Sequence, residues 1–357
     1  MGEHFQLVLS HVITASVFAW FVFPIFIKIL EKKKVLESPG ERKIHTEDTP
    51  SLGGIPIFVS VLIAALIWFP FREEPDFRYW LGSLCLVFFI GLRDDLIPLR
   101  PIFKVSSQLI PILICYFMFD MKLTSLYSFI PTEQFPEVIA LGLTCFTAII
   151  ITNSFNLIDG IDGLAGSVGM VSIGAFATWF FLTGNYHIAV ILFAFVGAII
   201  SFLYYNWQPA RVFMGDTGAL LIGFLLSSSA ILFININHAI PDSPYHFHAS
   251  VATAMSVLVI PLFDTFRIII LRIRKKQSPL KADNDHIHHR LFALGFSHTK
   301  IAVLYTITNL GFIVLVIVGK TLPDYVLFLI MGGITFFLTY LIERALKRKT
   351  RSQKASV

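Results

Sequence analysis

The sequence predicts an all-α polytopic integral membrane protein with about 11 transmembrane helices. Of its 357 residues, 55% are hydrophobic and only 14% are charged, whereas about 25% of residues are charged in a typical soluble domain. Apolar runs of roughly 20 residues recur along the whole chain, and a helix of that length can cross the hydrocarbon core of a bilayer. Together these observations favour a bundle of membrane-spanning helices.

Eleven apolar runs have the length and composition of a span. The first run lacks a basic flank and a small-residue cleavage pattern, so we expect it to be a retained helix. The third is short and the ninth continues into a polar extension, so a count of ten is the alternative. The expected spans are, in chain order, 6–28, 52–70, 79–92, 103–119, 137–155, 164–183, 187–205, 218–236, 249–266, 301–319 and 325–343.

The distribution of Lys and Arg predicts the orientation of these spans. If successive loops alternate between the two sides, 24 of the 28 Lys and Arg residues fall on one side and four on the other. Cytoplasmic loops carry this excess, so we expect a multi-pass protein of the cell (inner) membrane with its N-terminus outside. Residues 1–343 would form one domain, followed by a basic cytoplasmic tail, 344–357. The cytoplasmic loops are then 31–49, 93–101, 156–163, 206–216 and 267–300.

The net charge of +5 is explained by this orientation, and nucleic acid is not an expected partner. The three cysteines, Cys85, Cys115 and Cys145, each lie singly inside an apolar run. Neither a disulfide framework nor a thiolate metal site is indicated by that spacing.

A polar stretch interrupts the apolar sequence near residue 156. Asn153, Asn156, Asp159 and Asp162 follow one another at intervals of three, and on a continuing helix this spacing keeps side chains near one face. One interpretation is a helix N-cap at Asp162, but a cap leaves Asn156 and Asp159 without a role. We therefore favour a ligand-binding function for the stretch.

Two adjacent aspartates, Asp94 and Asp95, follow the run 79–92. Adjacent helical side chains point about 100° apart, so one carboxylate can face a cation and the other a reacting oxygen. Taken alone, a solvated pair beside Arg93 and Arg100 would be the preferred interpretation. The second acidic motif on the same predicted face favours function instead.

A third motif contains a single aspartate, Asp216, where the eighth span begins. Magnesium in proteins takes oxygen ligands, usually one or two carboxylates together with substrate phosphates and water. Asp216 and the amide oxygen of Asn156 would suit such a partial shell, and Phe213 could offer a flat face to a nucleobase. The alternative is a capped helix start with an interfacial aromatic residue.

Two basic motifs lie on the same predicted face. His286, His288, His289 and Arg290 cluster in the longest cytoplasmic loop. Zinc binding is one interpretation of the histidines, but cationic donors for a diphosphate fit better beside a magnesium site. Lys43 and His45, in the first cytoplasmic loop, could also hold phosphate.

Acidic, amide and basic side chains gathered at the cytoplasmic rim of a bilayer favour phosphoryl chemistry. Catalysis of phosphoryl transfer depends largely on positioning and charge neutralisation by a metal and by cationic groups. A lipid phosphate can reach such a rim from the bilayer, while a nucleotide reaches it from the cytosol. We therefore expect a candidate active site on the cytoplasmic face.

With these motifs in hand, the sequence resembles the polyprenyl-phosphate N-acetylhexosamine-1-phosphate transferases, which share a superfamily with phospho-N-acetylmuramoyl-pentapeptide-transferase. The resemblance covers nearly the whole chain, from Arg42-Lys43-Ile44-His45 to His286-Ile287-His288-His289-Arg290. It implies transfer of a sugar-1-phosphate from a UDP-N-acetylhexosamine to undecaprenyl phosphate, with release of UMP. It also implies a Mg²⁺ cofactor, for which Mn²⁺ can substitute, and allows a homodimer.

The resemblance also implies a role for each motif residue. Asp216, with Asn156 beside it, would hold magnesium, Asp94 would act as the base that readies the lipid phosphate, and Asp95 would support metal or phosphate. Asp159 and Asp162 would be further catalytic residues, in the uridine and diphosphate region of the donor. Contacts to the donor nucleotide and sugar would come from Asn206, Phe213, Lys43, His45, His286, His288, His289 and Arg290. Direct attack and a covalent aspartyl intermediate remain alternatives.

The pattern His-Ile-His-His, with Pro261-Leu-Phe-Asp264-Thr upstream, resembles the N-acetylglucosamine branch. The muramoyl-pentapeptide branch, the nearest alternative, carries three consecutive histidines. A CDP-alcohol phosphotransferase is disfavoured because Asp162-Gly163 continues into Leu-Ala-Gly-Ser rather than Ala-Arg. A cation transporter would place its acidic residues near the bilayer midplane, whereas these lie at one predicted surface.

Overall fold

The computed structural model describes residues 2–33, 49–127, 129, 134–277 and 286–355, and within these ranges every regular element is helical. The apolar runs are helical, because a backbone in hydrocarbon must satisfy its own hydrogen bonds. They are α1 (Gly2–Lys33), α2 (Gly54–Trp68), α3 (Phe77–Leu96), α4 (Pro101–Met118), α5 (Glu137–Asn156), α6 (Leu164–Leu182), α7 (Tyr186–Asn206), α8 (Gly215–Ala239), α9 (Ser250–Val257), α10 (Val259–Arg274), α11 (Ile287–Leu294), α12 (His298–Val318) and α13 (Asp324–Ala355).

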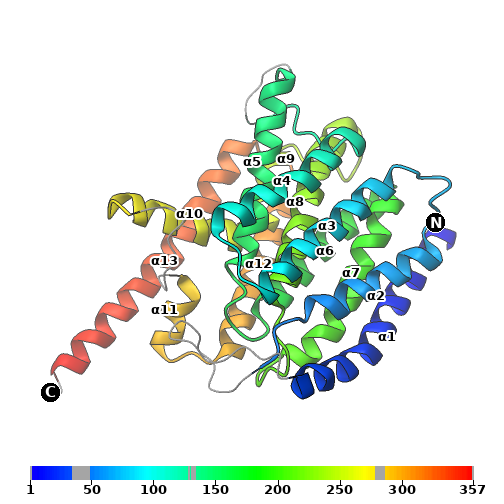
Figure 1. The fold of residues 1–357 in the computed structure, drawn as a ribbon. Helices are drawn as coiled ribbons and strands as arrows, with labels where there is room; N and C mark the ends of the chain where they lie inside the picture. Colours follow the sequence, from blue (N-terminus) through cyan, green and yellow to red (C-terminus); the bar gives the residue numbers. More distant parts are fainter. Residues whose placement is uncertain (1, 34–48, 128, 130–133, 278–285, 356–357) are drawn as a thin grey trace.

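Helix α8 lies at the centre of the bundle and packs against α3 and α5, while α6, α7, α2 and α1 complete one side. Helices α9 to α13 form the other side, where α12 packs on α6 and α13 contacts α9 and α11 (Figure 1). Because α8 is covered on all sides, it is the most deeply buried of the candidate spans. Its first residues are consequently held in place by several neighbouring helices.

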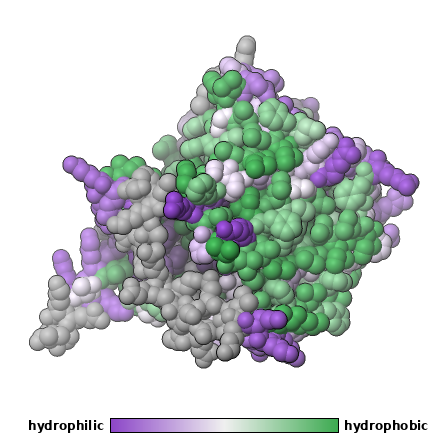
Figure 2. All heavy atoms as spheres, in the orientation of Figure 1, coloured by the Kyte–Doolittle hydropathy of each residue, from purple (hydrophilic) through white to green (hydrophobic). Residues whose placement is uncertain are grey.

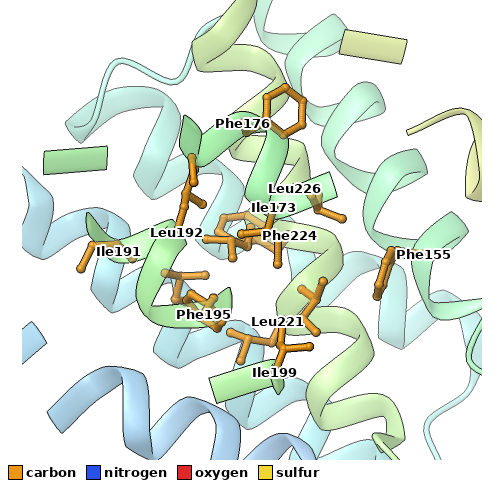
Figure 3. Close-up of a cluster of buried hydrophobic side chains, with 14 of the residues drawn as sticks. Phe155, Ile173, Phe176, Ile191, Leu192, Phe195, Ile199, Leu221, Phe224 and Leu226 are labelled. Atoms are coloured by element: carbon orange, nitrogen blue, oxygen red, sulfur yellow. The ribbon is translucent and has the colours of Figure 1, made fainter. Parts of the chain in front are cut away.

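The interior between α5, α6, α7 and α8 is filled by large apolar side chains, including Phe155, Phe176, Phe195 and Phe224, which are at most 2% exposed (Figure 3). Hydrocarbon surrounds such a bundle, so close packing rather than expulsion of water holds the helices together. The buried indole of Trp80 adds a hydrogen bond, its Nε1 donating to Ser228 Oγ at 3.0 Å. This packed interior fixes the ends of α5 and α8.

Eight of the described helices are long and apolar enough to cross a membrane, and a bent pair, α9 and α10, raises the number to nine if it counts as one span. Helix α2 is a shorter apolar helix of 15 residues, and α3 carries three charged residues in its last turn. Hydrophobic side chains cover much of the visible face of the bundle (Figure 2). The chain is therefore a polytopic membrane protein, and each of the eleven predicted ranges overlaps a helix or the bent pair.

The predicted span over 249–266 coincides with the bent pair, in which α9 and α10 meet at Leu258 with a bend of 88°, so this range is not a straight helix. Pro261 lies in the first turn of α10; it has no N–H to bond to the preceding turn, so the helix cannot continue straight through this point. Asp324, at the start of α13, accepts a 2.7 Å hydrogen bond from Ala252 N and so holds the start of α9.

The described part of the predicted basic tail, 344–357, is helical, because α13 continues to Ala355. Lys349 Nζ donates to Ala293 O at 2.9 Å, which ties this extension to α11. The C-terminal end of α13 projects away from the bundle in Figure 1.

Candidate active site

Four helices bring two carboxylates, an amide and an ammonium group together where α3 and α5 end and α4 and α8 begin. Lys104 Nζ lies 2.8 Å from Asp94 Oδ2 and 2.6 Å from Asp216 Oδ1. Asn156 Nδ2 donates a hydrogen bond to the same oxygen of Asp216. Two formal negative charges thus face one positive charge, which leaves the group able to attract a further cation.

Asp94 is held rigidly within this group. Only 7% of its surface is exposed, and its Oδ1 accepts a 2.6 Å hydrogen bond from Leu99 N while its Oδ2 faces Lys104. Because both oxygens have partners, the carboxylate has one orientation, which is the geometry that acid–base chemistry requires.

Asp95 points to a different partner, as the 100° offset predicted. Its Oδ1 accepts from Asp216 N and its Oδ2 from Thr217 N, both at 2.8 Å, and Thr217 Oγ1 also donates to Oδ2. These are donors of the first turn of α8, so Asp95 caps that helix from outside. Gly215 is required beside it, because its φ is +71° and a Cβ there would lie 2.8 Å from Asp95 Oδ2.

The stretch after Asn156 differs from one expectation. Helix α5 ends at Asn156 and α6 begins at Leu164, so Asp159 and Asp162 lie on the connecting turn and not on a continuing helical face. Asp159 is half-buried and Asp162 is 5% exposed. The two glycines that follow these aspartates provide the break in the helix.

Asp162 and Asn206 join three cytoplasm-predicted segments to one another. Asn206 Oδ1 accepts from Gly163 N at 2.9 Å and its Nδ2 donates to Val212 O at 2.8 Å. Asp162 Oδ2 lies 3.3 Å from Ala210 N and 3.3 Å from His298 Nδ1 at the start of α12. The loops 157–163 and 207–214 are therefore held against each other by buried polar contacts.

Phe213 is placed by its backbone. Its N donates to Pro50 O at 2.7 Å, and its O accepts from Gly53 N at 2.8 Å, so the loop before α8 pairs with the segment that leads into α2. The ring is half-buried. Lys43 and His45 belong to residues 34–48 and lie outside the described residues.

The histidine motif begins α11 and lies against the Asn/Asp turn. His286 Nδ1 is 2.8 Å from Asp264 Oδ2, and its ring stacks on His288 with centroids 5.4 Å apart. A Cβ on Gly160 would lie 2.9 Å from His288 Nε2, which shows how closely this imidazole covers the turn. His289 follows with its ring 4.3 Å from that of His288.

Two further properties of the motif bear on its chemistry. Burial, with a smaller effect from the neighbouring His289, lowers the pKa of His288 to about 3, so its ring is neutral near pH 7. Arg290 Nη1 forms a 2.8 Å ion pair with Glu343 Oε1 of α13. In this structure Arg290 therefore faces a carboxylate, and an anionic ligand would have to compete with Glu343 for it.

The residues present fit a hard divalent cation. Asp216 carries a carboxylate and Asn156 an amide oxygen, and because the amide nitrogen bonds Asp216, the amide oxygen is directed elsewhere. Oxygen donors of this kind suit Mg²⁺, which keeps several water or phosphate ligands. No group of three or more His, Cys, Asp or Glu with metal-ligating geometry occurs in the described ranges, so any ion would need a partial shell completed by substrate.

Two apolar cavities of about 340 Å³ each flank α10. One lies between α10, α11, α12 and α13 and includes Asp264 and Tyr305 in its lining. The other lies between α5, α8, α9 and α10, with Phe146 and Phe266 at its edge. Both are lined almost entirely by hydrocarbon side chains, which is suited to an alkyl or prenyl chain.

The sequence did not single out two residues of this site. Lys104 lies at the start of an apolar run, where a lone lysine also fits an orientation signal; its position ten residues after Asp94 was the available clue. His298 follows the histidine motif by only eight residues but belongs to the next helix. Both reveal their partners only once the helices are packed.

The fold and the site define a polytopic membrane protein with an acid–amide–lysine centre suited to phosphate chemistry. Residues 77–234 match the family described as Glycosyl transferase family 4. The chain is 30% identical over 344 residues to the undecaprenyl-phosphate alpha-N-acetylglucosaminyl 1-phosphate transferase of Yersinia pestis. The aligned region covers 92% of each of the two chains.

Two further relatives are also 30% identical. A probable undecaprenyl-phosphate N-acetylglucosaminyl 1-phosphate transferase of Bacillus subtilis aligns over 90% of this chain and 87% of its own. A decaprenyl-phosphate N-acetylglucosaminephosphotransferase of Mycolicibacterium smegmatis aligns over 74% and 70%. The chain therefore belongs to the polyprenyl-phosphate N-acetylhexosamine-1-phosphate transferase family.

Proposed function

We propose that this protein transfers N-acetylglucosamine-1-phosphate from UDP-N-acetylglucosamine to undecaprenyl phosphate and releases UMP, which initiates a lipid-linked cell-surface glycan. The observation that carries this proposal is the meeting of Asp94, Lys104, Asn156 and Asp216 at the ends of four helices. The names of the relatives support the same acceptor and the same transferred group.

In this reaction an oxygen of the lipid phosphate attacks the β-phosphorus of the donor. The new P–O bond forms as the bond from that phosphorus to the bridging oxygen breaks, and the bridging oxygen leaves on UMP. The negative charge of both phosphates must be neutralised for them to approach, and phosphoryl transfer depends mainly on that neutralisation and on alignment.

Asp216 and Asn156 are the proposed ligands of Mg²⁺. When bound, the ion would neutralise phosphate charge and orient the donor. The geometry that supports this assignment is that Asp216 lies beside the Asn156 amide where four helices meet, so one carboxylate and one amide are close enough to share an ion. Asp95 contributes indirectly, by capping the helix that carries Asp216.

Asp94 is the proposed base for the lipid phosphate. Lys104 is the cation that forms ion pairs with both Asp94 and Asp216 and so fixes their relative positions. Direct attack by the lipid phosphate and a covalent aspartyl intermediate remain alternatives for the chemical step.

The donor would lie over the turn 157–163 and under the histidine motif. Asp159, Asp162, Asn206 and Phe213 belong to the two loops that the buried contacts hold together. His286, His288, His289 and Arg290 would supply polar and cationic contacts to the diphosphate and sugar. Lys43 and His45 are proposed to complete the nucleotide site.

We further propose eleven spans with the N-terminus outside and the site and C-terminus in the cytoplasm. The 24-to-4 distribution of Lys and Arg supports this orientation, as does the requirement of the reaction for a cytosolic nucleotide. The apolar cavity between α5, α8, α9 and α10 supports entry of the acceptor from the bilayer.

The test is a transfer assay with purified full-length protein, undecaprenyl phosphate and a panel of UDP-sugars, with products identified by mass spectrometry. We expect a lipid-linked N-acetylglucosamine diphosphate and UMP in equal amounts, only with a divalent cation present. Transfer from UDP-N-acetylmuramoyl-pentapeptide alone would contradict the proposal. Asp216→Asn should abolish most activity and raise the magnesium concentration needed for half-maximal rate; an unchanged magnesium titration would refute that ligand.

A further inference from the structure

Asp264 is a buried carboxylate that the proposed reaction does not yet use. It lies on α10, just beyond the bend, and only 2% of it is exposed. Its Oδ2 is 2.8 Å from His286 Nδ1, and its Oδ1 accepts from Ile287 N at 3.1 Å and from the Arg267 guanidinium at 3.1 Å. A carboxylate with this many donors is held in one position.

These contacts determine how His286 can hold its protons. An ionised carboxylate only accepts hydrogen bonds, so His286 Nδ1 must carry a proton and Nε2 is left as the variable site. A second proton at Nε2 would create an imidazolium ion whose charge Asp264 balances. The other titratable or charged groups around Asp264 are Arg267 on α10, His288 on α11 and Tyr305 on α12.

His286 is linked to the turn 157–163 through His288, which lies between them. The ring of His286 is nearly parallel to that of His288, at 12°, and His288 covers Gly160. Asp264 itself lies behind these rings, on the side of the apolar cavity between α10 and α12. It is therefore placed to act on the site through His286 and not by contact with substrate.

We infer that Asp264 is a positioning residue: it holds His286 through Nδ1–H and balances the charge of the imidazolium ion whose Nε2–H faces the diphosphate of the donor. This inference rests on the proposed function for the identity of that ligand. The Asp264–His286 contact then sets donor affinity and its pH dependence, while the lipid acceptor is bound elsewhere.

The experiment uses purified full-length wild type, Asp264→Asn, His286→Gln and the double variant. Steady-state rates are measured against UDP-N-acetylglucosamine and against undecaprenyl phosphate between pH 6 and pH 9, and donor binding is measured by calorimetry without acceptor. For Asp264→Asn we expect a donor KM about tenfold higher and an acceptor KM within about twofold of wild type. The dependence of donor KM on pH should also change, because the charge that balances the imidazolium ion is lost.

The double variant separates positioning from a general effect on folding. If Asp264 acts through His286, adding Asp264→Asn to His286→Gln should raise donor KM no further, because residues that act as one unit are not additive. Asp324→Asn is a matched control, since Asp324 is also fully buried and accepts from a backbone N–H at a helix start. It should leave donor KM and its pH profile unchanged.

An equal loss on both backgrounds, or a donor KM and pH profile that stay at wild-type values in Asp264→Asn, would overturn the inference. Failure of the proposed function has a different signature, since wild type would then transfer nothing to the lipid. The calorimetric arm still decides in that case: a wild-type donor affinity in Asp264→Asn excludes the positioning role, and a tenfold weaker affinity supports it.

Discussion

Asp94 and Asp95 are adjacent in the chain, yet their carboxylates serve different elements. Asp94 Oδ2 lies 2.8 Å from Lys104 Nζ of α4, whereas Asp95 accepts hydrogen bonds from the first residues of α8. A pair that looks redundant in sequence therefore divides into a carboxylate that faces Lys104, the proposed base, and a structural cap.

This division predicts that substitution of Asp95 mainly lowers stability, whereas substitution of Asp94 mainly lowers the turnover number. Asp95→Ala removes an N-cap and should lower the free energy of unfolding by about 1–2 kcal/mol. Asp94→Asn keeps an acceptor for Leu99 N and should change stability much less, while lowering kcat by about 10²-fold or more. Thermal unfolding and transfer assays in the same detergent check both. Wild-type melting of Asp95→Ala would contradict the capping role.

Substitution of Lys104 should lower activity as strongly as substitution of Asp94 or Asp216. Lys104→Met leaves Asp94 and Asp216 facing each other without a cation, and we expect kcat/KM to fall by about 10²-fold or more, as for loss of one preorganised donor. The matched control is Lys122→Met, whose ammonium group lies 5.1 Å from the Tyr116 ring centroid in a different part of the bundle. Equal activity of the two variants would exclude the assigned role.

His298 should affect donor binding more than turnover. It lies 3.3 Å from Asp162 Oδ2, and the next residue, Thr299, donates from its N to Gln208 Oε1 at 3.2 Å. His298→Ala removes the contact with Asp162 on the turn 157–163, so we expect donor KM to rise about tenfold, corresponding to about 1–2 kcal/mol, with kcat within about twofold. Thr306→Ala, further along α12, is the control. A fall in kcat without a change in KM would contradict this prediction.

His288 makes stability depend on pH. Its pKa in the folded protein is about 3, below its ordinary value of 6.5, chiefly because burial disfavours the charged ring. Below about pH 6.5 the unfolded chain gains a proton that the folded chain does not, so stability should fall with decreasing pH. The expected loss is about 1 kcal/mol per pH unit.

Melting temperatures between pH 4.5 and pH 7.5 check this dependence, with His288→Gln as the comparison. The variant should show a flatter profile over that window. If wild type and variant fall in parallel as the pH decreases, another group is responsible for the acid sensitivity.

The helices could be predicted from the sequence because hydrocarbon imposes length and apolar composition on every span. The bend at Leu258 could not, since Pro261 is compatible both with a kinked span and with a new helix start. The reach of α13 to Ala355 was also unexpected. A basic segment indicates orientation, but it does not reveal where the helix that carries it ends.

The sequence was sufficient to locate the motifs of the candidate site, but it did not reveal every residue that their side chains contact. Asp94, Asn156 and Asp216 were expected to meet, and they do, at Lys104. Asn206 was predicted to contact the nucleoside, whereas both ends of its amide bond protein backbone. Whether it also contacts a ligand stays a prediction. Contacts of this kind depend on how loops from different helices are set against each other, which spacing along the chain does not encode.

The ammonium group of Lys104 has a consequence for the stability of this protein. Two carboxylates left facing each other at the edge of a membrane would be costly, but here a lysine of the same chain offsets them. This internal neutralisation predicts that the fold does not depend on a bound ion. Treatment with a chelating agent should therefore leave the melting temperature unchanged.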